Sequence, residues 1–310
     1  MTPPLEAQGL VHQTTPSKDD LAKPRIANVL TIAGTDPSGG AGVQADIKSF
    51  SAMGGYAMSV ITAVVAQNTR GVHSVVSLDP TFVGEQIDAV FEDVRVDAVK
   101  IGMLANAQII ETVADRLRRY DARNVVVDPV MVAKSGDHLL DPDAVAALRE
   151  LIVPSARLIT PNLPEAAELL EEEPDWSIEL MREKSAELGL LGSDWVLLKG
   201  GHLTSSDWSI DVLYGPVGDT EPDITELRAP RIPTDNDHGT GCTLSAAITA
   251  LLPHHGMHDS VRSAKEYLQS SLAASDLLEV GTGHGPLHHF HRLWENLPQT
   301  ITGKGAPLAS

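Results

Sequence analysis

Short apolar runs and amphipathic segments alternate along most of the chain. The apolar runs have the length and the Val and Ile content of buried strands, and they lie at 28–33, 57–66, 98–101, 124–128, 158–160 and 195–199. Segments with apolar residues at helical spacing fall between them, at 43–53, 80–90, 107–120, 141–152, 164–170 and 178–188. This alternation predicts an α/β fold in which helices cover both faces of a mostly parallel sheet.

The last third of the chain departs from this alternation. Segments 210–214 and 226–232 are predicted to be late strands that form an antiparallel edge, and helices are expected at 241–252, 259–278 and 286–296. No internal repeat or linker interrupts the pattern, so residues 27–297 are predicted to form a single domain. Residues 1–26 lack the apolar region of a signal peptide and are expected to be a disordered extension, and 298–310 a flexible tail.

Charge and cysteine content narrow the functional classes. The formal net charge of −19 disfavours nucleic acid and anionic membrane surfaces as partners. A nucleotide could bind only if Mg²⁺, lysines and backbone dipoles offset this charge locally. The single cysteine suits a reducing cytoplasm, and no apolar run is long enough to span a membrane.

The strongest chemical signal is the glycine turn at residues 236–245. Gly239 and Gly241 precede a segment with helical spacing, so unpartnered backbone N–H groups at a helix start should point one way. Such an arrangement binds anions and stabilises developing phosphoryl charge. Cys242 stands at this helix start, where the helix N-terminus is expected to lower the pKa of its thiol and make it a candidate catalytic group.

Other candidate residues lie at or just after the predicted strand ends. Because functional loops gather at the carboxyl ends of parallel strands, one pocket could collect these residues, which are Gly34, Gln67, Gly102, Asp128, Asn162 and Lys199. Lys199 precedes two glycines, which suits contact with phosphate. Gln67 can donate and accept hydrogen bonds at once, as recognition of a heteroaromatic ring edge requires.

Several of these residues also have purely structural interpretations. The loop 34–42 is either a tight turn or a loop that approaches a ligand, and Asp36 within it either accepts from a substrate donor or caps a helix. Asp128 either binds local N–H groups or holds hydrated Mg²⁺. Asn162 and Glu165 have the spacing of a capping box, but they could equally lie near Mg²⁺ and phosphate.

The histidines of the C-terminal region suggest zinc, but their spacing fits no standard site and they have no cysteine partner nearby. We interpret them as surface or packing residues; they are His254, His255, His258, His284, His288, His289 and His291.

Seven motifs together resemble the hydroxymethylpyrimidine/phosphomethylpyrimidine kinase family of thiamine biosynthesis, which has a ribokinase-like fold. They occur in family order within residues 28–296 and read GTDPSGGAGVQAD, AVVAQNTRGV, KIGML, VVVDPVMVAKSGD, LITPNLPEA, LLKGGH and HGTGCTLSAAI. The resemblance implies transfer of the γ-phosphoryl group of ATP to a hydroxymethylpyrimidine and then to its monophosphate. It also implies that the reaction requires Mg²⁺, and it leaves open whether a monovalent cation is bound. The expected assembly is a homodimer.

The resemblance also implies roles for residues that match its motifs. Gln67 would read the pyrimidine edge, in a pocket that Gly34, Met103 and Val130 line with Asp36 close by. Asp128 and Glu165 would organise Mg²⁺.

On the phosphate side, Lys199 would contact phosphate with Asn162 beside it. Gly239, Thr240 and Gly241 would form the anion hole. Cys242 would stand where many ribokinase-like enzymes have a catalytic Asp, either as the base or as a residue that shapes the pocket.

One departure concerns the approach to the anion hole. Where the family pattern K-N-T-H-G-T-G-C is expected, this chain has Asp235-Asn236-Asp237-His238, and two acids there should weaken nucleotide binding unless they face solvent or bind a cation.

Three rival functions remain. They are pyridoxal kinase, a cysteine hydrolase using Cys242 with His238, and a catalytically silent binder of nucleotide or vitamin precursor.

Overall fold

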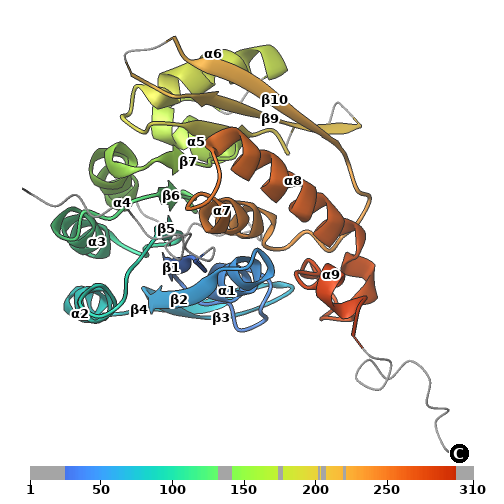
Figure 1. The fold of residues 1–310 in the computed structure, drawn as a ribbon, viewed down its shortest axis with the longest axis horizontal. Helices are drawn as coiled ribbons and strands as arrows, with labels where there is room; N and C mark the ends of the chain where they lie inside the picture. Colours follow the sequence, from blue (N-terminus) through green and yellow to red (C-terminus); the bar gives the residue numbers. More distant parts are fainter. Residues whose placement is uncertain are drawn as a thin grey trace, which may run out of the picture.

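The computed structural model describes residues 25–131, 142–173, 177–201, 203, 207–218 and 221–297. Within them, eight strands form one sheet in the order β10-β9-β8-β7-β6-β5-β1-β2 (Figure 1). Their bounds are β1 (Asn28–Ala33), β2 (Tyr56–Ile61), β5 (Ala98–Ile101), β6 (Val125–Val127), β7 (Leu158–Ile159), β8 (Val196–Lys199), β9 (Trp208–Gly215) and β10 (Asp223–Pro230). Neighbouring strands from β2 to β8 are parallel, and β9 and β10 add the predicted antiparallel edge.

Helices cover both faces of this sheet, as the alternating pattern predicts. One face packs against α2 (Pro80–Phe91), α3 (Ala107–Arg119), α4 (Pro142–Ala147), α5 (Leu163–Leu170) and α6 (Ile178–Gly189), whose apolar residues share one core with the strands. The opposite face packs against α1 (Gly42–Ala52), α7 (Thr240–Leu251) and α8 (Met257–Ala273) (Figure 1). The ribokinase-like arrangement of layers is therefore present.

The predicted single strand at 57–66 is wrong, because the chain turns out of the sheet at Thr62. The Thr62 hydroxyl donates to the Met103 carbonyl at 2.7 Å, and β3 (Ala63–Asn68) then pairs with β4 (Gly71–Ser77) as a separate antiparallel hairpin. The strand β4 was not predicted. The continuous Val and Ile run hides this break, because apolar content alone does not show where a strand changes sheets.

Two other predicted helices differ from the structure. The segment predicted at 286–296 contains only the short helix α9 (His291–Trp294), because its first residues pair with a distant loop through the bridge between His238 and Pro286. The helix predicted at 141–152 continues past α4 as a wider π-helical turn over Leu148–Ile152. The predicted extension 1–26 lies outside the described residues except for 25 and 26, and the tail 298–310 lies wholly outside them. In the described part of the chain, no helix has the length and apolar character needed to cross a bilayer.

Candidate active site

A cavity of about 440 Å³ opens at the carboxyl ends of the parallel strands, where α7 begins. Most residues that the sequence singled out line it, namely Gly34, Gln67, Met103, Asp128, Val130, Asn162, Glu165, Lys199, Gly239, Thr240, Gly241 and Cys242. Gly102 and Asp36 do not line it. The prediction that strand ends gather their candidates in one pocket is thus confirmed for all of them but Gly102.

The glycine turn at the start of α7 has the geometry that anion binding requires. Gly239 has φ +83°, and a side chain on it would lie 1.8 Å from the carbonyl oxygen of Gly40, so no other residue fits. The N-cap residue of α7 is Gly239 itself, which has no side chain that could cap the helix starting at Thr240. The Thr240 N–H makes only a long hydrogen bond of 3.4 Å to the Asp237 carbonyl, so this helix start offers weakly occupied N–H groups to an anionic ligand.

The interpretation of Asp36 as a direct substrate ligand is not supported by its position. Its carboxylate is fully buried and accepts hydrogen bonds from the backbone N–H groups of Ser38, Gly40 and Ala41 at 2.7–3.0 Å. It also binds Nε2 of His238 at 2.8 Å. Burial by itself raises the pKa of this carboxyl. Hydrogen bonds from His238, Ser38 and Gln67 lower the pKa by more than burial raises it, so it lies well below its ordinary value. Asp36 therefore shapes the glycine loop and orients Gln67.

Asp128 and Lys199 form a buried ion pair at the floor of the cavity. Lys199 Nζ lies 2.9 Å from Asp128 Oδ1 and 3.8 Å from Glu165 Oε2. Burial lowers the pKa of the Lys199 ammonium, but the two carboxylates raise it more, so the lysine stays charged. The carboxylate of Asp128 therefore has Lys199 as its ion-pair partner, and it accepts hydrogen bonds from the hydroxyls of Thr160 and Ser245, both at 3.2 Å.

The capping-box interpretation of the Asn162–Glu165 pair is confirmed, and the role near Mg²⁺ and phosphate stays a prediction. Asn162 Oδ1 accepts from the Glu165 N–H at 2.9 Å and Glu165 Oε2 accepts from the Asn162 N–H at 2.7 Å, which is a complete capping box at the start of α5. The same two residues line the cavity. Burial raises the pKa of Glu165 to about 7, since Lys199 opposes that rise only in part.

The expectation that the helix start lowers the thiol pKa of Cys242 is wrong. Burial raises the pKa of Cys242 to about 11, and the carboxylates of Asp128 and Asp46 add to the rise while Lys100 opposes it. The free protein therefore holds a neutral thiol at neutral pH. Burial next to negative charge outweighs the helix dipole here, because a thiolate loses its hydration when it is enclosed.

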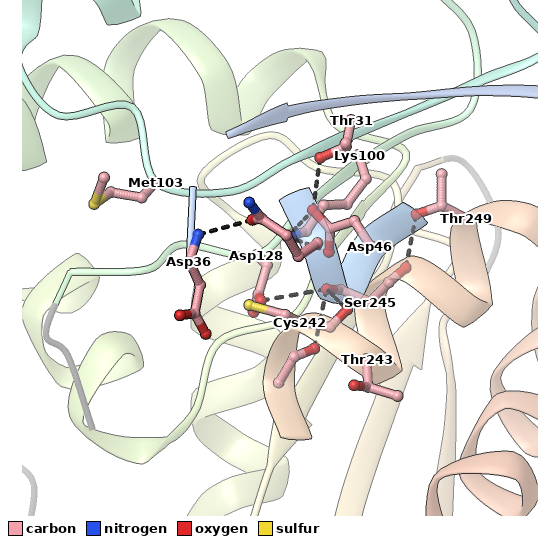
Figure 2. Close-up of polar contacts among 12 residues, drawn as sticks. Thr31, Asp36, Asp46, Lys100, Met103, Asp128, Cys242, Thr243, Ser245 and Thr249 are labelled. Carbon is pink, nitrogen blue, oxygen red and sulfur yellow. Dashed lines mark hydrogen bonds and ion pairs between the residues drawn. The ribbon is translucent and has the colours of Figure 1, made fainter. Parts of the chain in front are cut away.

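A buried ion pair beneath Cys242 escaped the sequence analysis. Lys100 Nζ lies 3.0 Å from both oxygens of Asp46, neither side chain has any exposed surface, and Thr31 donates to the same carboxylate at 2.6 Å (Figure 2). Burial raises the pKa of Asp46, and Lys100 and Thr31 oppose that rise. A lone lysine within the apolar run at 98–101 was the signal that could have revealed this pair.

A second cavity of about 300 Å³ joins the first and was not predicted. The two share five lining residues, Asn162, Lys199, Asp237, Thr240 and Gly241. The walls of the second cavity include apolar residues of α7 and α8, the buried pair of Lys265 with Asp211, and residues 230–232 and 234. Because these segments lie far apart in the sequence, no local motif marks the cavity.

The histidines near the C-terminus pack as the sequence suggested. His288, His289 and His291 are buried, and His289 Nε2 lies 3.0 Å from the Thr243 hydroxyl. Among the residues that the structure describes, no group of three or more His, Cys, Asp or Glu side chains could hold a metal ion.

Comparison with known proteins decides the family. The model of the family described as phosphomethylpyrimidine kinase matches residues 36–288, which include all lining residues of the two cavities except Ala33, Gly34 and Thr35. The chain belongs to the phosphomethylpyrimidine kinase family. It is 56% identical over 268 residues to a hydroxymethylpyrimidine/phosphomethylpyrimidine kinase of Escherichia coli, an alignment that covers 86% of this chain and 98% of that protein. Members of this family are phosphotransferases, and so is this kinase.

Solved structures agree with this assignment. A phosphomethylpyrimidine kinase from Clostridium difficile superimposes with a TM-score of 0.68 at 41% identity, covering 79% of this chain and 99% of that one. A Bacillus subtilis pyridoxal kinase in complex with ADP gives a TM-score of 0.78 at 34% identity, covering 87% of this chain and 100% of that one. The structure also weighs against the cysteine-hydrolase alternative, because burial raises the pKa of Cys242 to about 11 and so disfavours the thiolate that would act as its nucleophile.

Proposed function

We propose that this kinase transfers the γ-phosphoryl group of ATP to the hydroxymethyl group of 4-amino-5-hydroxymethyl-2-methylpyrimidine and then to the resulting monophosphate. The observation that carries the proposal is the meeting of two cavities at the start of α7, with Lys199 and the N–H groups after Gly239 at their junction. Phosphoryl transfer needs positioning and charge stabilisation at one point between donor and acceptor, and this junction supplies both.

The first cavity suits the pyrimidine and the second suits the nucleotide. Gln67 would read the ring edge, with Gly34, Met103 and Val130 as the walls. A side chain at Gly34 would lie 2.4 Å from the end of the Met103 side chain, so a larger residue there would push Met103 out of its place in this wall. Lys199, Thr240 and Asn162 would contact the phosphates of a nucleotide whose base occupies the second cavity.

The residues present fit a magnesium ion that is held mainly by phosphate and water. Asp128 and Glu165 offer carboxylate oxygens at the cavity wall, which is the ligand type that Mg²⁺ prefers. Lys199 already lies between these two carboxylates, so the protein provides too few free oxygens for a complete shell. Bound Mg²⁺ would neutralise phosphate charge, while Asp128 and Glu165 orient its water ligands.

The decisive experiment supplies Mg-ATP with hydroxymethylpyrimidine, and in parallel with pyridoxal, and identifies the products by mass spectrometry. Mono- and diphosphorylated pyrimidine would support the two-step kinase. Pyridoxal is included because a Staphylococcus aureus pyridoxal kinase solved with AMP-PCP and pyridoxal superimposes with a TM-score of 0.77 at 30% identity. Pyridoxal phosphate as the sole product would replace the pyrimidine proposal with this alternative.

The variant Gln67→Ala is expected to raise KM for the pyrimidine by about tenfold, because it removes the paired donor and acceptor that read the ring edge. KM for ATP should stay unchanged, since Gln67 lines only the first cavity. Steady-state kinetics with each substrate varied in turn makes the measurement. An unaltered pyrimidine KM would exclude Gln67 as the ring reader.

The variant Cys242→Ala is expected to lower kcat by about 10²-fold, on the scale of losing a general base. Because the pKa of the thiol is raised to about 11, only a small fraction is thiolate at neutral pH, and that fraction grows as pH rises toward the pKa. The kcat of the unaltered kinase should therefore increase with pH above neutrality, and Cys242→Ala should lose this increase. Equal kcat and equal pH slopes would remove Cys242 from the chemistry.

We also propose that the kinase is a homodimer and that it is located in the cytoplasm. A homodimer is favoured by the exposed valines Val64 and Val76, which are directly paired across β3 and β4 and would be covered by a second copy. A cytoplasmic location is favoured by the single free cysteine.

A further inference from the structure

A buried ion pair forms part of the wall of the second cavity. Nζ of Lys265 on α8 lies 2.5 Å from Asp211 Oδ2, and it also donates to the Ser209 carbonyl at 3.3 Å. Only 8% of the Lys265 side chain and 7% of the Asp211 side chain are exposed. An enclosed ion pair adds little net stability compared with apolar residues of similar size, so stability alone does not explain its place in this wall.

The other carboxylate oxygen of Asp211 contacts the strand that carries Lys199. Asp211 lies directly opposite Lys199 in the antiparallel register of β8 and β9, and its Oδ1 accepts from the Gly200 N–H at 3.1 Å. The ladder between these strands ends at this pair, so the carboxylate takes the place of the next backbone acceptor. A side chain at Gly200 would lie 2.1 Å from the Ile210 carbonyl oxygen, which shows how closely the two strands approach here.

The backbone at Lys199 is therefore fixed from both sides. Towards β7, the Lys199 N–H donates to the Pro161 carbonyl at 2.8 Å, and towards β9, Asp211 binds the N–H of the next residue. The turn that follows is held by Arg231, whose Nη1 donates to the Gly201 carbonyl at 2.8 Å. The direction in which the Lys199 side chain leaves the strand thus depends on a carboxylate from β9.

We propose that Asp211 is a positioning residue for the nucleotide, acting through Lys199. Its carboxylate fixes the Gly200 N–H and with it the end of β8, so that the Lys199 ammonium stays at the junction of the two cavities. Lys265 holds Asp211 in this orientation from α8. The inference rests on the proposed contact between Lys199 and the phosphates of ATP, and it makes the antiparallel edge of the sheet part of the nucleotide site.

Two double variants separate the acceptor from the ion pair. Both contain Lys265→Met, so that neither leaves an enclosed charge without its partner. Asp211→Leu with Lys265→Met removes the acceptor of the Gly200 N–H and should lower kcat/KM for ATP by about tenfold. Asp211→Asn with Lys265→Met keeps an acceptor oxygen and should stay within about threefold of the original kcat/KM. KM for the pyrimidine should stay unchanged in both, because Asp211 and Lys265 line only the second cavity.

The same two double variants combined with Lys199→Met show whether Asp211 acts through Lys199. In that background they should differ in kcat/KM for ATP by less than about twofold, because the side chain that Asp211 positions is absent. A merely structural role for Asp211 would give the same difference of about tenfold with and without Lys199. That result overturns the inference, and so do equal kcat/KM values of the two double variants when Lys199 is present.

The matched control is Asp97→Ala. Asp97 also joins a strand-end N–H to a cation, since its Oδ2 accepts from the Asn28 N–H at 2.8 Å and its Oδ1 from Arg95 at 2.7 Å. It lines neither cavity, so its loss should leave kcat/KM for ATP unchanged.

Two further measurements keep the test decisive. Circular dichroism shows whether each variant keeps the fold, and Asp211→Ala with Lys265→Met replaces the leucine variant if leucine is too large for the wall. If the kinase phosphorylates neither hydroxymethylpyrimidine nor pyridoxal, the proposed function fails. Calorimetry of the same variants with Mg²⁺ and a nonhydrolysable ATP analogue then gives Kd values that still decide the role of Asp211.

Discussion

Replacing Lys199 by methionine is expected to lower kcat/KM for ATP by about 10³-fold. Two effects act together: the ammonium near the transferred phosphoryl group is lost, and Asp128 and Glu165 are left without the cation that lies 2.9 and 3.8 Å from them. Both carboxylates then repel the incoming phosphates. Initial rates at varied ATP and saturating pyrimidine measure the change.

The matched control for Lys199→Met is Lys184→Met. Lys184 also pairs with two carboxylates, Glu172 at 2.7 Å and Glu187 at 2.9 Å, but it lies on the surface of α6 and lines neither cavity. Its loss should leave the kinetics unchanged. Circular dichroism would show that both variants keep the fold. A Lys199→Met variant with kcat/KM within tenfold of the original would show that this lysine does not stabilise the transferred charge.

The second large effect concerns stability. Lys100→Met is expected to lower the free energy of unfolding by about 3–5 kcal/mol, because the enclosed Asp46 carboxyl loses its cation and must either stay ionised without water or take up a proton as its pKa rises further. Both partners are fully buried between β1, β5 and α1, so water cannot replace the lost interaction. Urea unfolding followed by circular dichroism gives the change in the unfolding midpoint.

A double variant separates the ion pair from simple packing. Lys100→Met combined with Asp46→Leu removes both charges and should recover most of the lost stability, since an apolar pair can replace a buried ion pair at little cost. Arg118→Met, which removes one member of the exposed pair with Asp115 at 3.9 Å, serves as the surface control and should not shift the midpoint. If the double variant were no more stable than Lys100→Met, lost packing rather than an unpaired charge would explain the effect.

Local sequence determined most of the secondary structure and the chemistry at the strand ends. The strand at 98–101 has the bounds that periodicity predicts and the helix that starts at Pro80 ends one residue later than predicted, because alternation and capping depend on neighbouring residues. The break at Thr62 was missed, since the valines on both sides have the same propensity whichever sheet they join. Strand propensity indicates that a segment is extended, but it does not indicate which other strand the segment pairs with.

The sequence by itself therefore determined the family, the α/β fold and the glycine turn that starts α7. Each of these depends on residue types at short spacing, where backbone geometry follows from local sterics. Only the tertiary structure decided that Cys242 is a neutral thiol, that Asp36 shapes a loop, and that Lys265 pairs with Asp211. Burial, charge and pairing depend on groups that are far apart in the chain, and these become neighbours only when the sheet and its helices pack.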